Sequence, residues 1–316
     1  MSIWPILDDA FRVARLAPPA NFPVPMVLDT DTYNEVDDQF ALVYSLLEPN
    51  LDLQAVYAAP FHNSRSNGPE DGMIRSYAEI KKLFSLARIK DCPPVFEGSR
   101  TYMTAPDSPV DSPAARDLIR RAMARPEEDP LYVVAIGCPV NVSSALLLEP
   151  NLVRHIVLVW LGGNPLTWSD ATEFNLMQDI HASRVLFDSG VPMVLMPCRQ
   201  VTDHLSTTVP ELKYYLQDAS PLGQYLLDFV IDFVKEGHAG VGWSKVIWDP
   251  ITVIWLVHPE SVTTRLAATP ILNDNLRYSL DPTRPFLREG LLPDRDFIFR
   301  ELFTLLRTSR INATES

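Results

Sequence analysis

The stretch "PMVLDTDTYNEVDDQFALVYSLLEP" (residues 25–49) combines a short apolar run, an acidic loop and a second apolar segment with helical character. The run at 25–29 is continuous rather than alternating, which is typical of a strand buried on both faces of a parallel sheet. The loop concentrates five acidic side chains, and like charges this close repel unless water or a cation separates them. This cluster therefore predicts a cation site, formed by some of the residues Asp29, Asp31, Glu35, Asp37 and Asp38.

The same succession of strand and helix continues along the chain. Further apolar runs rich in Val, Ile and Leu occupy 53–60, 131–137, 155–163 and 191–197. Helical segments between them predict an α/β fold, with a mostly parallel sheet flanked by helices. Residues from about 205 to 265 are predicted to be largely helical, and a closing helix is predicted near the C-terminus. Since no repeat or linker interrupts the sequence, we expect a single domain, 1–316.

Composition and charge restrict the possible partners and location. The chain has 27 basic and 40 acidic residues, for a formal net charge of −13, and no basic block. This disfavours nucleic acids and anionic membrane surfaces as partners, and no apolar run is long enough to span a bilayer. The N-terminal residues lack the pattern of a secretory signal. Cys92, Cys138 and Cys198 fit neither a disulfide framework nor a zinc site, which predicts reduced thiols in a cytoplasmic protein.

Oxygen-bearing side chains follow the predicted strands, where an open parallel sheet binds its ligands. Besides the acidic cluster, these residues are Asn63, Asn164, Glu173 and Asn175, and Asp249 precedes a late apolar helix. We expect carboxylates and amides, and no basic residues, to meet at this edge. Such hard donors favour Ca²⁺ or Mg²⁺ over zinc.

Each of these residues also has a structural interpretation. Asp37 or Asp38 could cap the following helix, and Asp249 could cap the helix that Pro250 begins. Asn63 and Asn175 could be turn residues. A helix cap explains one aspartate but not the whole cluster, so the cation site is the favoured interpretation.

Five motifs in the right order resemble the nucleoside hydrolases that prefer inosine and uridine. The first is the Asp-x-Asp followed by the paired Asp37 and Asp38. The others are "AAPFHN" (58–63), "VVAIGCPVNVSSALLLEPNLV" (133–153), "LGGN" with "TEFNLMQDIHAS" (161–164 and 172–183) and "WDPITVIWL" (248–256). Any one of them alone would be weak evidence, whereas their order along the chain is a strong signal.

This resemblance implies a Rossmann-like core and calcium-dependent hydrolysis of the N-glycosidic bond of ribonucleosides to ribose and free base. It implies that Ca²⁺ is held by Asp31, Asp38, the carbonyl of Val140 and Asp249, with Asp31 as the general base for the attacking water. It implies a nucleoside as small-molecule partner and a homodimer or homotetramer. The implied sugar-binding residues are Asp37, Asn63, Glu173 and Asn175, with Asn164 as a further candidate.

Two departures from the family pattern concern the site. The segment "TYNEV" (32–36) lengthens the acidic loop, and Trp248 stands where many members have a histidine that helps to protonate the departing base. An indole cannot usefully donate that proton, but it can stack on a base. Two alternatives remain open. One is a nucleoside- or ribose-binding protein that has lost turnover. The other is a phosphatase of the haloacid-dehalogenase type, because "LDTDT" (28–32) resembles the Asp-x-Asp at the strand end of those enzymes.

Overall fold

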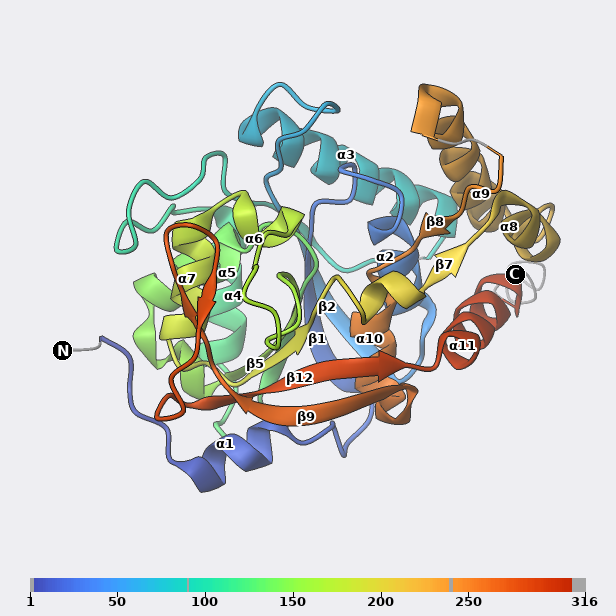
Figure 1. Ribbon diagram of the computed structural model, residues 1–316. Coiled ribbons are helices and arrows are strands. Elements are labelled where there is room, and N and C mark those ends of the chain that lie inside the picture. The colour runs from blue at the N-terminus through green and yellow to red at the C-terminus, as the bar shows by residue number, and fades with distance from the viewer. Residues whose placement is uncertain (1–2, 90, 239–240, 309–316) are drawn as a thin grey trace.

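A single eight-stranded sheet forms the centre of the protein, as the computed structural model shows for residues 3–89, 91–238 and 241–308 (Figure 1). All neighbouring strands are parallel except the last pair, β12 and β9. In spatial order the strands are β3 (Val95–Glu97), β2 (Leu51–Ala58), β1 (Val24–Thr30), β4 (Leu131–Ala135), β5 (Ile156–Leu161), β6 (Met193–Met196), β12 (Phe286–Pro293) and β9 (Val262–Ala268).

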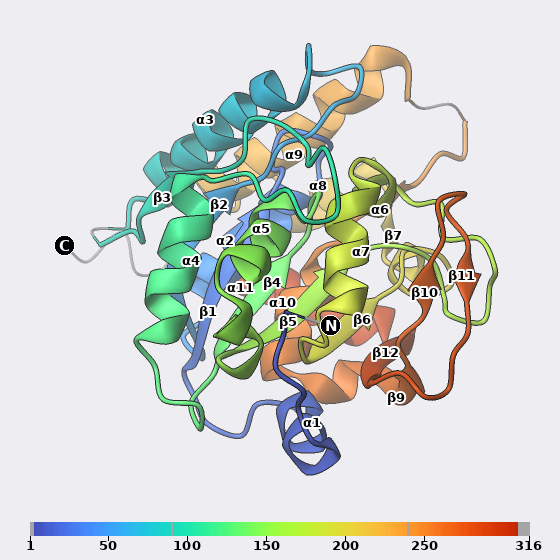
Figure 2. The same ribbon diagram turned by 90° about the vertical axis from the view of Figure 1, so that its left-hand side faces the viewer.

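Helices cover both faces of this sheet, because successive side chains of each central strand point to opposite sides. In β1, Met26 and Leu28 join one apolar core and Val27 joins the other. The first core packs under α2 (Asp38–Leu47), α3 (Pro69–Ala87), α8 (Val209–Leu216), α9 (Pro221–Phe233), α10 (Pro250–Val257) and α11 (Arg295–Thr308). The second packs under α4 (Pro113–Met123), α5 (Val140–Leu148) and α7 (Ile180–Asp188), which lie in front of the sheet in Figure 2.

Short elements connect these layers near the carboxyl ends of the strands. The helix α6 (Phe174–Met177) follows β5, and β7 (Ser206–Thr207) pairs with β8 (Lys245–Val246) just before α10. The helix α1 (Asp9–Leu16) packs near β12. None of the helices in the part of the chain described here is both long and apolar enough to cross a membrane.

The sequence predicts the buried strands correctly and misses β12 and β9 at one edge of the sheet and the short β3 at the other. The five predicted strands are β1, β2, β4, β5 and β6, and the predicted closing helix is α11. The prediction of helix up to about residue 265 is wrong at its end, where β9 begins. The strand β9 exposes Thr263, Arg265 and Leu266, and β12 carries Arg288 and Glu289, so neither strand has a continuous run of buried apolar residues. The buried Glu289 is balanced by Arg265 of β9, at 2.7 Å.

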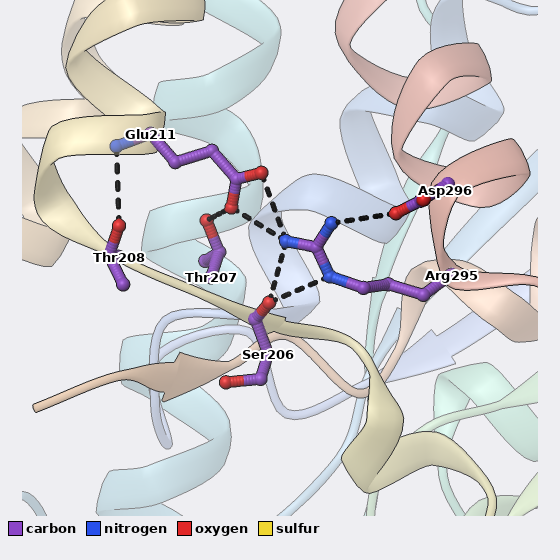
Figure 3. A network of polar contacts seen from close by, with 6 residues as sticks. All are labelled: Ser206, Thr207, Thr208, Glu211, Arg295 and Asp296. Atoms are coloured by element: carbon purple, nitrogen blue, oxygen red, sulfur yellow. Dashed lines mark hydrogen bonds and ion pairs between the residues drawn. The ribbon is translucent and has the colours of Figure 1, made fainter.

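An arginine on the first turn of α11 ties this helix to β7 and to the first turn of α8 (Figure 3). Arg295 donates hydrogen bonds to the carbonyl of Ser206, and its Nη2 lies 2.7 Å from the carboxylate of Glu211. That carboxylate also accepts a bond from the hydroxyl of Thr207. Because β8 runs directly toward Asp249, this network helps to position the late part of the site.

Candidate active site

A cluster of buried carboxylates lies where α2 and α10 begin. Oxygen atoms of Asp37, Asp38 and Asp249 all lie within 4.8 Å of one another. Asp37 and Asp249 occupy the N-cap positions of the two helices, which pack against each other, but neither side chain makes a capping hydrogen bond. Helix capping therefore does not explain these aspartates, and their oxygens are available to a ligand.

Asp31 lies beside this cluster and is fully buried. Within the described chain, neither of its oxygens has a donor in hydrogen-bonding geometry, whereas Asp38 accepts a bond of 2.5 Å from the hydroxyl of Thr30. Burial raises the pKa of Asp31, Asp38 and Asp249 well above the usual range, and mutual repulsion raises it further. A group of buried acids without a basic partner is the environment that a hard cation stabilises. The donor set therefore fits a divalent cation.

The end of β4 approaches Asp31 closely, and this approach requires glycine. A Cβ atom added to Gly137 would lie 3.0 Å from Cγ of Asp31 and 3.1 Å from its backbone nitrogen. Beneath them, Asp29 accepts a hydrogen bond of 2.8 Å from the amide of Asn141. Burial raises the pKa of Asp29 to about 7, although this hydrogen bond partly opposes the rise.

A cavity of about 460 Å³ opens at the acidic cluster. It is lined by most residues that the sequence predicts for the site: Asp37, Asp38, Asn63, Asn164, Glu173, Asn175, Trp248 and Asp249. Two predicted residues do not line it. Asp31 is buried beside the cluster, and Val140 is the first residue of α5, with its side chain in the apolar core.

The wall after β5 presents amide oxygens. Glu173 caps α6, accepting hydrogen bonds from the backbone nitrogens of Gly163, Asn175 and Leu176, and it also lines the cavity. The amide nitrogen of Asn175 donates to two strand-end carbonyls, and that of Asn164 donates to the carbonyls of Asp170 and Thr172. The oxygens of both amides remain as acceptors for hydroxyl groups.

Asn63, a predicted sugar ligand, also makes hydrogen bonds within the protein. Its amide nitrogen donates to Oδ1 of Asn34 at 2.6 Å, and its oxygen accepts from the backbone nitrogen of Arg65 at 2.8 Å. Asn63 lines the cavity, but these bonds make it the connection between the acidic loop and the loop after β2.

The opposite wall is aromatic. Trp248 lies half-buried on it, and the ammonium group of Lys245 lies 3.9 Å from the centroid of its indole ring. Lys245 also forms an ion pair of 2.8 Å with Glu35 of the acidic loop. One face of the indole is thereby covered, which leaves at most one face for a base.

The expectation that no basic residue reaches this edge is wrong, because Arg65 and Arg199 line the cavity. Each follows a predicted strand, β2 and β6, by a few residues, and that position was the signal available in the sequence. Phe233, at the end of α9, also lines the cavity. No motif marks it, since it reaches the site only through the packing of α9 beside α3.

Comparisons with known proteins agree with this geometry. The chain is 27% identical over 268 residues to the pyrimidine-specific ribonucleoside hydrolase RihA of Escherichia coli O1:K1 / APEC, covering 76% of this chain and 82% of the relative. Its fold is similar to a purine-preferring ribonucleoside hydrolase from Gardnerella vaginalis, with a TM-score of 0.74, 21% identity and coverage of 90% and 98% of the two chains. A plant nucleoside hydrolase, PpNRh1, superposes with a TM-score of 0.70, 20% identity and coverage of 90% and 99%.

The model of the inosine-uridine preferring nucleoside hydrolases matches residues 26–277. The matched region contains the acidic loop, every residue named above as lining the cavity, and both helices that present the carboxylates. It also decides against the phosphatase alternative, which accounts only for the first Asp-x-Asp. The chain belongs to the inosine-uridine preferring nucleoside hydrolase family and is an N-glycosidase of that class.

Proposed function

We propose that this enzyme hydrolyses ribonucleosides to ribose and free base with Ca²⁺ at the cluster of Asp31, Asp38 and Asp249. The observation that carries the proposal is the group of buried carboxylates without capping bonds at the floor of a cavity. The carbonyl of Val140 is the fourth proposed ligand. A divalent cation there offsets the repulsion between the carboxylates and acidifies a neighbouring water.

The other steps of the proposed reaction depend on side chains of the protein. Asp31 is the proposed general base, since its oxygens are buried and free of hydrogen-bond donors in the described structure. Asp37, Asn164 and Asn175 line the cavity and are the proposed partners of the ribose hydroxyls. As the glycosidic bond breaks, positive charge grows on the ribose, and the surrounding carboxylates stabilise it.

Glu173 and Asn63 are proposed to bind the ribose and also to hold neighbouring parts of the site in place. Glu173 orients Asn175 by capping α6, and Asn63 fixes the acidic loop against the loop after β2. We also propose a cytoplasmic homodimer or homotetramer, as the family resemblance implies. Light scattering on the purified protein measures the oligomeric state.

The test is a reducing-sugar assay over inosine, adenosine, guanosine, uridine and cytidine. Activity should disappear after metal depletion and return with Ca²⁺, and metal analysis should find one calcium per chain. Activity restored by zinc but not by calcium would contradict the metal assignment. Nucleoside binding without ribose release would contradict the proposed hydrolysis.

A further inference from the structure

Arg65 is a cation held on the cavity wall without an anionic partner. Its guanidinium packs against three aromatic rings, at 4.5 Å from the ring centroid of Tyr33, 5.2 Å from Phe229 and 6.0 Å from Phe233. Its Nη1 donates a hydrogen bond of 3.1 Å to the backbone carbonyl of Glu35. In the described part of the chain no carboxylate lies within ion-pair distance of it, in a protein with a net charge of −13.

A neighbouring arginine shows that a guanidinium packed against Tyr33 can also have a carboxylate partner. Arg75 also lies over the ring of Tyr33, at 5.8 Å, but it is paired with Asp71 at 2.8 Å and does not line the cavity. Arg65 lines the cavity, and its single side-chain hydrogen bond leaves other N–H donors of the guanidinium unused. The three rings restrict its motion, so these donors have a fixed position.

Arg65 follows β2, whereas the amides of Asn164 and Asn175 follow β5, and β1 and β4 lie between these two strands in the sheet. Phe233 contacts Arg65 and also Lys245, whose ammonium group lies over Trp248, so these side chains form one continuous wall. If the carboxylates and amides hold the ribose, as the proposed function states, the base extends toward this wall. Aromatic rings and a guanidinium there match a flat heterocycle that carries carbonyl or ring-nitrogen acceptors.

We propose that Arg65 is a catalytic residue that stabilises the departing base, an inference that rests on the proposed function. When the C1′–N bond breaks, both electrons go to the base, the water oxygen bonds to C1′, and the proton of the water goes to Asp31. The base leaves with negative charge and afterwards takes a proton from solvent. A guanidinium does not release its own proton, but its charged N–H groups hydrogen-bond to the anionic base and lower the barrier.

The proposal makes leaving-group activation depend on the substrate. A base such as hypoxanthine or uracil is a poor leaving group and needs this stabilisation. The p-nitrophenolate of p-nitrophenyl β-D-ribofuranoside is a stable anion that departs without it. R65A should therefore lower kcat/KM on inosine and uridine by about 10- to 100-fold, the range expected for a hydrogen bond to a charged group. On p-nitrophenyl riboside it should change kcat/KM by less than about threefold, and R65K should recover part of the loss because it keeps the charge.

The matched control is R75A, which removes the other arginine over Tyr33 and should leave both classes of substrate unaffected. Melting temperatures show whether each variant folds, and R65K serves if R65A does not. An equal loss on nucleosides and on p-nitrophenyl riboside would overturn the proposal, as would full activity of a folded R65A on inosine.

If the wild-type protein cleaves neither substrate class, the proposed function is wrong, and calorimetry then tests the position of Arg65. Weaker inosine binding by R65A with unchanged ribose binding would keep Arg65 at the base, and unchanged inosine binding would remove it.

Discussion

Buried acids should make the metal-depleted protein less stable as the pH rises. Asp29 gives the magnitude, because burial raises its pKa from 3.8 to about 7. This shift of about 3 units corresponds to about 4 kcal/mol at 1.36 kcal/mol per unit. Its ionised form is the unfavourable one in the folded protein. The contribution of Asp29 to the free energy of unfolding is therefore largest below pH 3.8. It falls as the pH rises toward 7 and changes no further above that value.

About 2 kcal/mol of this loss falls between pH 5.5 and 8, a large part of the 5–15 kcal/mol that usually stabilises a domain. The pKa values of Asp31, Asp38 and Asp249 shift in the same direction and add to the slope. Urea unfolding of the EDTA-dialysed protein at several pH values measures it. Excess Ca²⁺ should reduce the slope, since a bound cation favours the ionised carboxylates.

Two variants separate the share of Asp29 from that of other groups. Asp29→Asn removes the titration and should flatten the curve by about 2 kcal/mol over this range. Asp111→Asn is the control, because a hydrogen bond from Arg116 lowers the pKa of the exposed Asp111, so its effect appears only at more acidic pH. Equal stability at pH 5.5 and 8 in the depleted wild-type protein, with the same curve for Asp29→Asn, would refute the reasoning.

Three further substitutions test the site. Asp31→Asn should preserve the fold and sugar binding while lowering kcat at least 100-fold, because the general base is lost; near-full turnover would place the base elsewhere. Gly137→Ala should lower kcat by a similar factor, since its Cβ would lie 3.0 Å from Cγ of Asp31. Gly223→Ala is the control, because its Cβ would meet the Ser220 hydroxyl at 3.3 Å, away from the residues that line the cavity; equal activities would show that Asp31 tolerates displacement. If Trp248 stacks on the base, Trp248→Ala should lose about tenfold more activity on inosine than on uridine and Trp248→Phe should retain most of it; equal losses that follow the melting temperature would make Trp248 structural.

The sequence predicts the parts of the fold that depend on local composition. Strands buried on both faces must be continuously apolar, so β4 and β5 are evident from the sequence. The edge formed by β12 and β9 is not evident from the sequence. Its charged residues Arg265 and Glu289 form an ion pair between two strands, and the sequence does not show that these strands are neighbours.

The site divides in the same way. Carboxylates directly after β1 are visible as a motif, and their position at a strand end predicts that they meet Asp249. Arg65 is marked only by its position after β2, and its role depends on rings from α9 that reach it only in the folded protein. Glu173 belongs to a motif, but only its hydrogen bonds reveal that the carboxylate caps α6.

The carboxylates at the start of α2 and of α10 come from opposite ends of the matched sequence, and this has a consequence for folding kinetics. During synthesis β1, β2, β4, β5 and β6 all emerge before Asp249, so the central sheet can assemble while its cation site is still incomplete. The site closes only when α10 docks beside α2, a contact of high sequence separation that forms slowly. If Ca²⁺ binds as proposed, it can do so only after α10 has docked, so it is expected to lengthen the lifetime of the native protein rather than to speed its formation.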